Sequence, residues 1–377
     1  MDIRVDVSML TDVVYKHRNS LNKIAELGMK EYKTSKYIKD YLDVLGVEYE
    51  EYLETAIVGI IKGKKAKKNI AFRADMDALN IDGQIKHLCG HDGHMSVLLG
   101  LIEYLTINKD KLLDNIVFIF QPAEESPGGA LPLIKEGILE KYSVDEIYGL
   151  HIYPNIEEGF VGVKPHHFLA QTGEIDIKII GKGGHGAMPQ NAIDSIVIAS
   201  NFMNSIQSII SRNIRPLDEG VLTIGKIEGG SRRNIIAESV KLEGTIRAFK
   251  QEVYDKIKKR VREIACGFEK SFNCEINIEI RDDYPAVNND EELFYEFKEA
   301  IDNKYIKILE PLMIAEDFSY YQQHVKGLFF MLGSRNVDKE FVNGLHNIKF
   351  NFDEKILLNG INVYVELLKY KGALGII

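Results

Sequence analysis

The stretch between Lys68 and Leu150 decides the fold, and its apolar runs read KNIAFRADMD at 68–77, NIVFIF at 115–120 and EIYGL at 146–150. Short apolar runs of this kind are typical of buried strands. Two segments with helical periodicity, Met95–Leu105 and Ala130–Leu139, lie between these runs. Strands that alternate with helices predict an α/β domain whose mixed, mainly parallel sheet is covered by helices.

The sequence on either side extends this domain. The segment Leu10–Leu45 predicts two helices, and Asp353 is placed to cap a last helix that runs to about Tyr370. We therefore assign residues 1–171 and 282–377 to the α/β domain.

The middle of the chain has a different order of elements: strand, helix, strand, strand, helix, strand. Alternating isoleucines at 175, 177 and 179 mark the first of these strands. The successive segments are 174–180, 192–212, 221–227, 239–247, 253–268 and 274–280. This βαββαβ order is the ferredoxin-like pattern. We predict an inserted ferredoxin-like domain at 172–281.

Composition excludes several classes of protein. The chain has 377 residues, 45% hydrophobic and 27% charged, which is ordinary for a soluble globular protein. Its 47 basic and 56 acidic residues give a net charge of −9, which argues against binding to nucleic acid or to an anionic membrane. No run approaches the ~18 apolar residues of a membrane span, and MDIRVDVSML lacks the apolar core of a signal peptide. The sparse, odd set Cys89, Cys266 and Cys274 indicates a reducing compartment, so we expect a cytoplasmic protein.

Residues that can bind metal follow all three predicted strands of the α/β domain. Asp75 and Asp77 come after the first strand, Glu124 and Glu125 after the second, and His151 after the third. In an open α/β sheet, sites form beyond the carboxyl ends of the strands. We therefore expect these side chains to share one crevice.

The segment CGHDGH at 89–94 adds three further candidates, Cys89, His91 and His94, at the entry to a predicted helix. Thiol, imidazole and carboxylate groups that meet in one crevice predict a metal site. Taken alone, each feature also has an ordinary interpretation. The acidic pairs are typical of solvated turns, and a single Cys89 or His151 is typical of a packed interior.

The same motifs carry a resemblance that covers nearly the whole chain. They are RADMDAL at 73–79, CGHDGH at 89–94, FQPAEE at 120–125, GLH at 149–151, GKGGHGAMP at 181–189, NII at 234–236, EGTIR at 243–247, AEDF at 315–318 and GLH at 344–346. In this order they resemble the amidohydrolase branch of the M20 metallopeptidase family. That branch includes N-acetyldiaminopimelate deacetylases, hippurate hydrolases and hydrolases of auxin conjugates.

The resemblance implies a catalytic domain with two divalent metal ions, for which the mixed ligand set leaves Zn, Mn, Co or Ni open. The implied ligands are Cys89, His91, Glu125, His151 and His346. Glu124 matches the general base, and Asp75 and Asp77 match the acidic pair that supports the metals. In the inserted domain, His185 matches a histidine that reaches the reacting carbonyl, and Asn234 and Arg247 match positions that hold the substrate carboxylate.

The activity implied by the resemblance is metal-dependent hydrolysis of the amide bond of a small-molecule N-acyl-L-amino acid. N-acetyldiaminopimelate, an intermediate in lysine biosynthesis, is the leading substrate, because FIFQPAEESPGGA at 118–130 and NIRPLD at 213–218 look most like those deacetylases. Hippurate and a broad range of N-acyl amino acids are the alternatives. The inserted domain is expected to act as a lid and to form a homodimer.

Two hypotheses from other classes stay open. A cysteine hydrolase would use Cys89 as nucleophile with His91 or His94 as its base. A catalytically silent relative would act only as a binding module, but such a protein would normally have lost Glu124 or a ligand, and here all are present.

Overall fold

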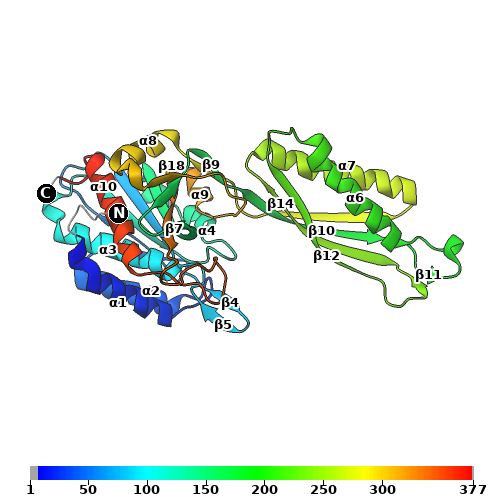
Figure 1. Ribbon diagram of the computed structural model, residues 1–377, viewed down its shortest axis with the longest axis horizontal. Coiled ribbons are helices and arrows are strands. Elements are labelled where there is room, and N and C mark those ends of the chain that lie inside the picture. Colours follow the sequence, from blue (N-terminus) through cyan, green and yellow to red (C-terminus); the bar gives the residue numbers. More distant parts are fainter. Residues whose placement is uncertain (1–6, 376–377) are drawn as a thin grey trace. The chain divides into compact units, whose positions relative to one another are not determined.

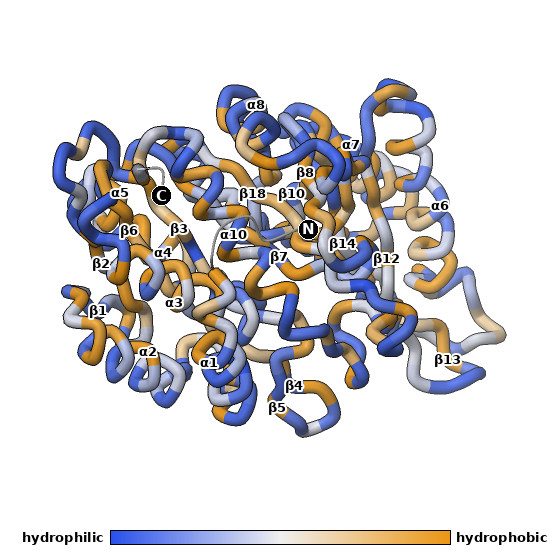
Figure 2. The backbone as a smooth tube through the Cα atoms, turned by 60° about the vertical axis from the view of Figure 1, so that its left-hand side comes forward, coloured by the Kyte–Doolittle hydropathy of each residue, from blue (hydrophilic) through white to orange (hydrophobic). Residues whose placement is uncertain are grey.

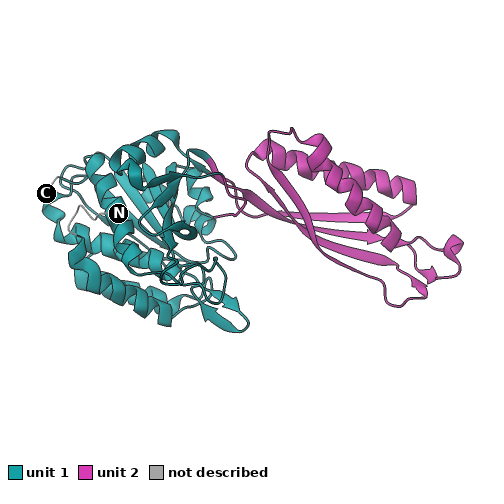
Figure 3. Cartoon of the chain, in the orientation of Figure 1, with its two compact units in different colours: residues 1–166, 288–310, 317–377 teal, residues 167–287, 311–316 magenta. Residues whose placement is uncertain are grey.

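The computed structural model describes residues 7–375, which form two compact units (Figure 3). Among these residues, unit 1 comprises 7–166, 288–310 and 317–375, and unit 2 comprises 167–287 and 311–316. Unit 2 thus takes in a short later segment that the sequence placed with the α/β domain. The reason is local pairing, since the amide of Ala170 donates to Leu312 O and the amide of Leu312 donates to Phe168 O.

Unit 1 is built on an eight-stranded sheet with the order β1-β2-β6-β3-β7-β18-β8-β17. These strands are β1 (Tyr49–Tyr52), β2 (Ala56–Ile61), β6 (Asn115–Gln121), β3 (Asn69–Asp75), β7 (Glu146–Glu157), β18 (Lys326–Arg335), β8 (Val161–Val163) and β17 (Ile306–Ile308). The central strands β6, β3, β7 and β18 are parallel to one another, whereas β2 and β8 join them antiparallel. The mixed, mainly parallel sheet predicted from the sequence is confirmed.

Helices cover this sheet (Figure 1). They are α1 (Thr11–Lys23), α2 (Tyr32–Leu45), α3 (His91–Ile107), α4 (Ala130–Lys135), α5 (Ile138–Lys141), α8 (Glu291–Ala300), α9 (Ser319–Gln322) and α10 (Lys355–Tyr370). Helix α3 packs on β3 and against α1 and α10, and nearly all of its side chains are buried. Close packing requires Gly100, where a Cβ atom would lie 2.4 Å from Ile361 Cδ1. Figure 2 colours β2 and β6 as largely hydrophobic, and nearly all residues of both strands are buried.

Several element boundaries in unit 1 differ from the sequence prediction. Strand β7 does not end before His151 but continues to Glu157, because it stays paired with β18 over its length. Helix α3 begins at His91 rather than Met95, after Gly90 with φ 90°. The helical stretch 130–139 is two helices, since Gly137 adopts a left-handed φ of 79° between α4 and α5. The short loop after Asp77 forms a hairpin of β4 (Leu79–Ile81) and β5 (Gln84–Lys86).

Unit 2 has a four-stranded antiparallel sheet with two long helices. The elements are β10 (Gln171–Ile180), α6 (Ser195–Asn213), β12 (Gly220–Gly229), β14 (Ser239–Ala248), α7 (Gln251–Phe272) and β15 (Glu275–Asp282). The spatial order β12-β14-β10-β15, with every neighbouring pair antiparallel, is the ferredoxin-like arrangement predicted from the sequence. Ile175, Ile177 and Ile179 are buried beneath the helices as their alternation predicts. Asp194 accepts amide hydrogen bonds from the first turn of α6.

Among the described residues, no helix is both long enough and apolar enough to cross a membrane.

Candidate active site

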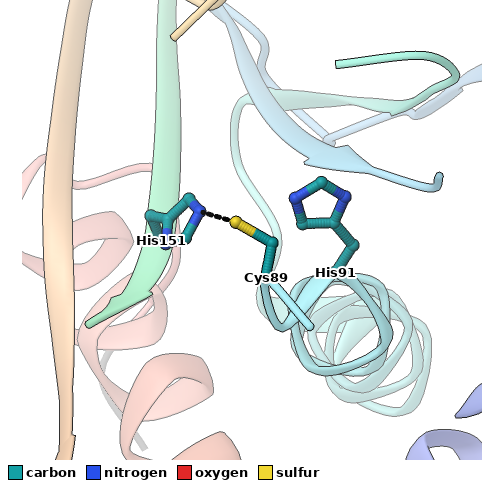
Figure 4. A group of neighbouring side chains, drawn as sticks. All are labelled: Cys89, His91 and His151. Carbon is teal, nitrogen blue, oxygen red and sulfur yellow. Dashed lines mark hydrogen bonds between the residues drawn. The ribbon is translucent and has the colours of Figure 1, made fainter. Parts of the chain in front are cut away.

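Cys89, His91 and His151 come together in unit 1 from the start of helix α3 and from strand β7 (Figure 4). Cys89 lies just before α3, His91 is the first residue of that helix, and His151 projects from the interior of β7. The Sγ atom of Cys89 lies 3.3 Å from Nε2 of His151. All three side chains are buried.

His346 and Glu125 complete the same cluster from distant parts of the chain. Nε2 of His346 lies 3.4 Å from Cys89 Sγ and 3.1 Å from Glu125 Oε1. The backbone holds His346 there, because its amide donates to the carbonyl of Leu88 at 2.9 Å.

The potential ligand atoms form overlapping groups whose members lie within 4.8 Å of one another. Four of these groups are Cys89–His91–His151, Cys89–Glu125–His346, His91–Glu124–Glu125 and Asp75–His91–His94. The structure therefore brings the five predicted metal ligands and Glu124 into one cluster, which we call the metal cluster.

Asp77 supports the metal cluster directly. Its carboxylate oxygens accept the backbone amides of Glu124 and Glu125, each at 3.0 Å. Nδ1 of His91 lies 2.9 Å from Asp77 O and 3.2 Å from its Oδ1, so Nδ1 carries the proton and donates. Asp77 thus leaves Nε2 of His91 as the atom that faces the cluster.

Asp75 supports the cluster through different neighbours. Ile152 donates its amide to Nε2 of His94, so His94 must donate from Nδ1 to Asp75 Oδ1, which lies 2.6 Å away. Arg73 Nη1 donates to the other oxygen of Asp75 at 2.8 Å. Burial raises the pKa of Asp75, but His91, His94 and Arg73 outweigh it and hold the pKa well below its usual range.

Burial and the charges of the cluster strongly shift the pKa values of its titratable groups. Burial lowers the pKa of His91, but the carboxylates of Asp75 and Asp77 outweigh burial and raise that pKa to about 10. Burial and the neighbouring His94 lower the pKa of His151 to about 3. Burial, with Glu125 and Glu124 close by, raises the pKa of the Cys89 thiol well above its usual value. A bound cation would counter this concentration of negative charge.

The donor set fits divalent metal ions. Nε2 of His91 is buried and has no hydrogen-bond partner in the described part of the chain. His151 donates from Nδ1 to the carbonyl of Ile152 at 2.7 Å, so its lone pair is on the Nε2 atom that faces Cys89. Imidazole nitrogens oriented in this way, with a thiol and carboxylates beside them, are the ligands that Zn, Mn, Co or Ni take in proteins.

The predicted substrate-binding residues lie in unit 2. His185 in β11 (Gly184–His185) and Asn234, just before β13 (Ile235–Ile236), line one cavity of about 690 Å³. Nδ1 of His185 accepts the amide of Ala187 at 3.1 Å, which places the proton of a neutral ring on Nε2. Arg247 on β14 is not among the residues that line this cavity, and it donates to the carbonyl of Met313 at 3.0 Å. The structure therefore brings His185 and Asn234 together and places Arg247 elsewhere in the unit.

The sequence matches the Peptidase family M20/M25/M40 over residues 71–370, most of the chain. The chain belongs to this family. The family membership that the motifs predict is thus confirmed. Members of the M20 family are hydrolases that act with a pair of metal ions.

Individual relatives of this M20 protein cover almost its whole length. The N-acetyldiaminopimelate deacetylase of Listeria monocytogenes serotype 4a (strain HCC23) is 38% identical over 370 residues, which span 94% of this chain and 98% of that protein. A candidate aminohydrolase from methicillin resistant Staphylococcus aureus has a similar structure, with a TM-score of 0.90, 31% identity and 97% coverage of each chain. The Bacillus subtilis YXEP protein, described as a dinuclear metal binding peptidase of the M20 family, has a TM-score of 0.83 at 27% identity and covers 96% of this chain and 98% of its own.

A buried polar network that has no role in the sequence prediction lies beside Asp75. Asp317 accepts hydrogen bonds from Arg73 Nη2 at 2.7 Å, from the Gln121 side chain and from the amides of Gly129 and Ala130. The network ties the ends of β3 and β6 to the loop that follows Glu125. Arg73, Gln121 and Asp317 fall in the motifs RADMDAL, FQPAEE and AEDF, but the motifs do not show that these three side chains contact one another.

Proposed function

We propose that this M20 protein hydrolyses the amide bond of an N-acyl-L-amino acid, with N-acetyldiaminopimelate as the leading substrate. The observation that carries the proposal is the metal cluster, in which Glu124 and the five potential ligands meet. The Listeria deacetylase, 38% identical and covered over 98% of its length, supports this choice of substrate.

Two divalent ions, held by Cys89, His91, Glu125, His151 and His346, would supply a water of lowered pKa and would polarise the scissile carbonyl. Glu124 is buried among these ligands, and its backbone amide is held by Asp77. In the proposal, the Glu124 carboxylate takes a proton from the attacking water and passes it to the leaving amine. Carboxylic acid and free amino acid are the products.

The residues of unit 2 are proposed to contact the substrate. His185 would donate from Nε2–H to the oxyanion of the tetrahedral intermediate. Asn234 and Arg247 would bind the substrate carboxylate, for which a guanidinium offers paired donors. A homodimer formed through this unit and a cytoplasmic location are part of the same proposal, and the three free cysteines support a reducing compartment.

The cysteine-nucleophile alternative has less support. A nucleophilic cysteine needs a lowered pKa. In the cluster, burial and the neighbouring Glu125 and Glu124 raise the pKa of Cys89 instead.

Metal analysis followed by a substrate panel tests the proposal. The purified protein is assayed with N-acetyldiaminopimelate, hippurate and simple N-acetyl amino acids, before and after a chelator and after Zn, Mn, Co or Ni is returned. We expect turnover of N-acetyldiaminopimelate that the chelator abolishes and a divalent ion restores. Preference for hippurate would show that hippurate, and not N-acetyldiaminopimelate, is the substrate. Activity that survives the chelator and is lost on alkylation would favour the cysteine mechanism.

A further inference from the structure

Three consecutive backbone amides, those of Ala123, Glu124 and Glu125, are held by two buried carboxylates. Asp77 accepts the second and third amides, as described above. The first amide, that of Ala123, donates to Oε1 of Glu31 at 2.9 Å. Glu31 comes from a distant part of the chain, immediately before α2, and none of the roles above involves it.

The position of Glu31 is unusual for a carboxylate. The residue is 0% exposed, and its other oxygen accepts a hydrogen bond from the hydroxyl of Thr55 at 3.1 Å. In the described part of the chain, no basic side chain forms an ion pair with Glu31. Burying a carboxylate without a counter-ion costs free energy, so the hydrogen bonds that Glu31 accepts must offset that cost.

The loop that Glu31 holds is conformationally demanding. Ala123 has a φ of 55°, in the left-handed region that costs free energy for a residue with a Cβ atom. The segment before Glu31 also lies against this loop, because a Cβ atom at Gly28 would be 2.4 Å from Ser126 O and 2.9 Å from Ala123 Cβ. The loop carries both Glu124 and Glu125 into the metal cluster.

We propose that Glu31 is a positioning residue, which holds the Ala123 amide and so fixes the backbone from which Glu124 and Glu125 reach the metal cluster. The inference rests on the proposed function in that it takes Glu124 to be the general base. What the role requires is a hydrogen-bond acceptor at this point rather than a negative charge.

Two substitutions of Glu31, one that keeps the acceptor and one that removes it, test this requirement. Glu31→Gln keeps a carbonyl oxygen for the Ala123 amide and an amide group that can donate to Thr55 Oγ1. Glu31→Leu fills a similar volume but leaves the buried Ala123 amide without an acceptor. Glu26→Ala is the matched control, because Glu26 lies on the same segment and accepts the amides of Lys33 and Thr34 at the start of α2 without contacting the loop.

The test measures two quantities in the full-length protein. One is kcat and KM with the N-acyl amino acid that the wild type cleaves, and the other is amide hydrogen exchange of peptides covering 121–126 in the metal-free protein. For E31L we expect kcat to fall by about 10- to 100-fold with little change in KM, as for a catalytic group displaced by a fraction of an ångström, and exchange in 121–126 to become faster. E31Q and E26A should match the wild type in both.

Wild-type kcat or wild-type exchange in E31L would overturn the inference, as would E31Q or E26A losing as much activity as E31L. If E31L does not fold, Gly28→Ala, which forces a Cβ atom against Ser126 O of the same loop, is measured in its place. Lower kcat with faster exchange in G28A supports the inference, and an unchanged protein overturns it. A wild type that cleaves no amide contradicts the proposed function, whereas the exchange data still decide whether Glu31 holds the loop.

Discussion

Nδ1 of His91 lies 3.2 Å from Oδ1 of Asp77, in a contact that fixes the orientation of the imidazole ring. Removing a carboxylate that orients a metal-binding histidine costs about 10- to 100-fold in metal affinity. We therefore expect Asp77→Asn to weaken metal binding by about this factor, measured by titrating the metal-free protein with Zn²⁺ against a competing chelator. Asp82→Asn, an exposed substitution in the β4–β5 hairpin, should bind as the wild type does. Equal affinity in D77N and wild type would show that Asp77 does not support the metals.

Glu124→Gln tests the general base. The amide cannot take a proton from water, so turnover should fall by about 100-fold or more, the usual contribution of a positioned acid or base. Metal content, measured on the same preparation, should stay that of the wild type, because Glu125 and the other four proposed ligands are unchanged. Glu136→Gln, on the exposed surface, is the control. Substantial activity in E124Q would remove Glu124 from this role.

A pair of cysteine substitutions tests the link between metal and stability. A ligand that binds only the folded state stabilises it by about 2.7 kcal/mol at 100 times its Kd, so added divalent ion should raise the Tm of the metal-free protein. Cys89→Ala should lose most of this increase, and Cys266→Ala, at an exposed position, should keep it. A full increase in C89A would place the metal elsewhere.

His17 predicts a pH dependence of stability that is independent of the metal cluster. Its side chain is buried, with Nδ1 2.8 Å from the Tyr37 hydroxyl and Nε2 lacking a partner in the described structure. Burial lowers the pKa of His17 from 6.5 to about 4. Between those values the unfolded chain binds more protons than the folded one, so this residue's contribution is complete above pH 6.5 and falls by about 3 kcal/mol as the pH drops to 4.

The measurement is denaturant unfolding at pH 7 and at pH 4.5. Wild type should lose more stability on acidification than His17→Phe, which lacks the titrating group. His324→Gln, which removes an exposed histidine, should lose as much stability on acidification as the wild type does. An identical loss in wild type and H17F would show that His17 does not titrate in this range.

The fold was predictable because its elements have strong periodicities of their own. The apolar runs at β3 and β6 and the isoleucine alternation of β10 are local signals that the tertiary structure keeps. The end of β7 was misplaced because His151 interrupts an apolar run, and a buried polar side chain in mid-strand looks like the end of a strand. Only the pairing with β18, more than 170 residues later, carries the strand onward.

The predicted ligands and the supporting pair Asp75 and Asp77 could be named from the sequence because they fall in motifs, but the long-range contacts around them could not. Glu31 meets Ala123 across 92 residues, and Arg73 meets Asp317 across 244. Neither contact leaves a local pattern, since each depends on where the sheet brings the chain. Nor does the sequence show that Arg247, on β14, is absent from the lining of the cavity that contains His185 and Asn234.

The contrast between Cys89 and Cys266 has a practical consequence. The first is buried with a raised pKa, and the second is exposed on α7 in unit 2. Thiolate formation and access together govern how fast a maleimide reacts. A fluorophore added at neutral pH is therefore directed to Cys266, so that movements of unit 2 could be followed by fluorescence without a mutation in the hydrolytic machinery.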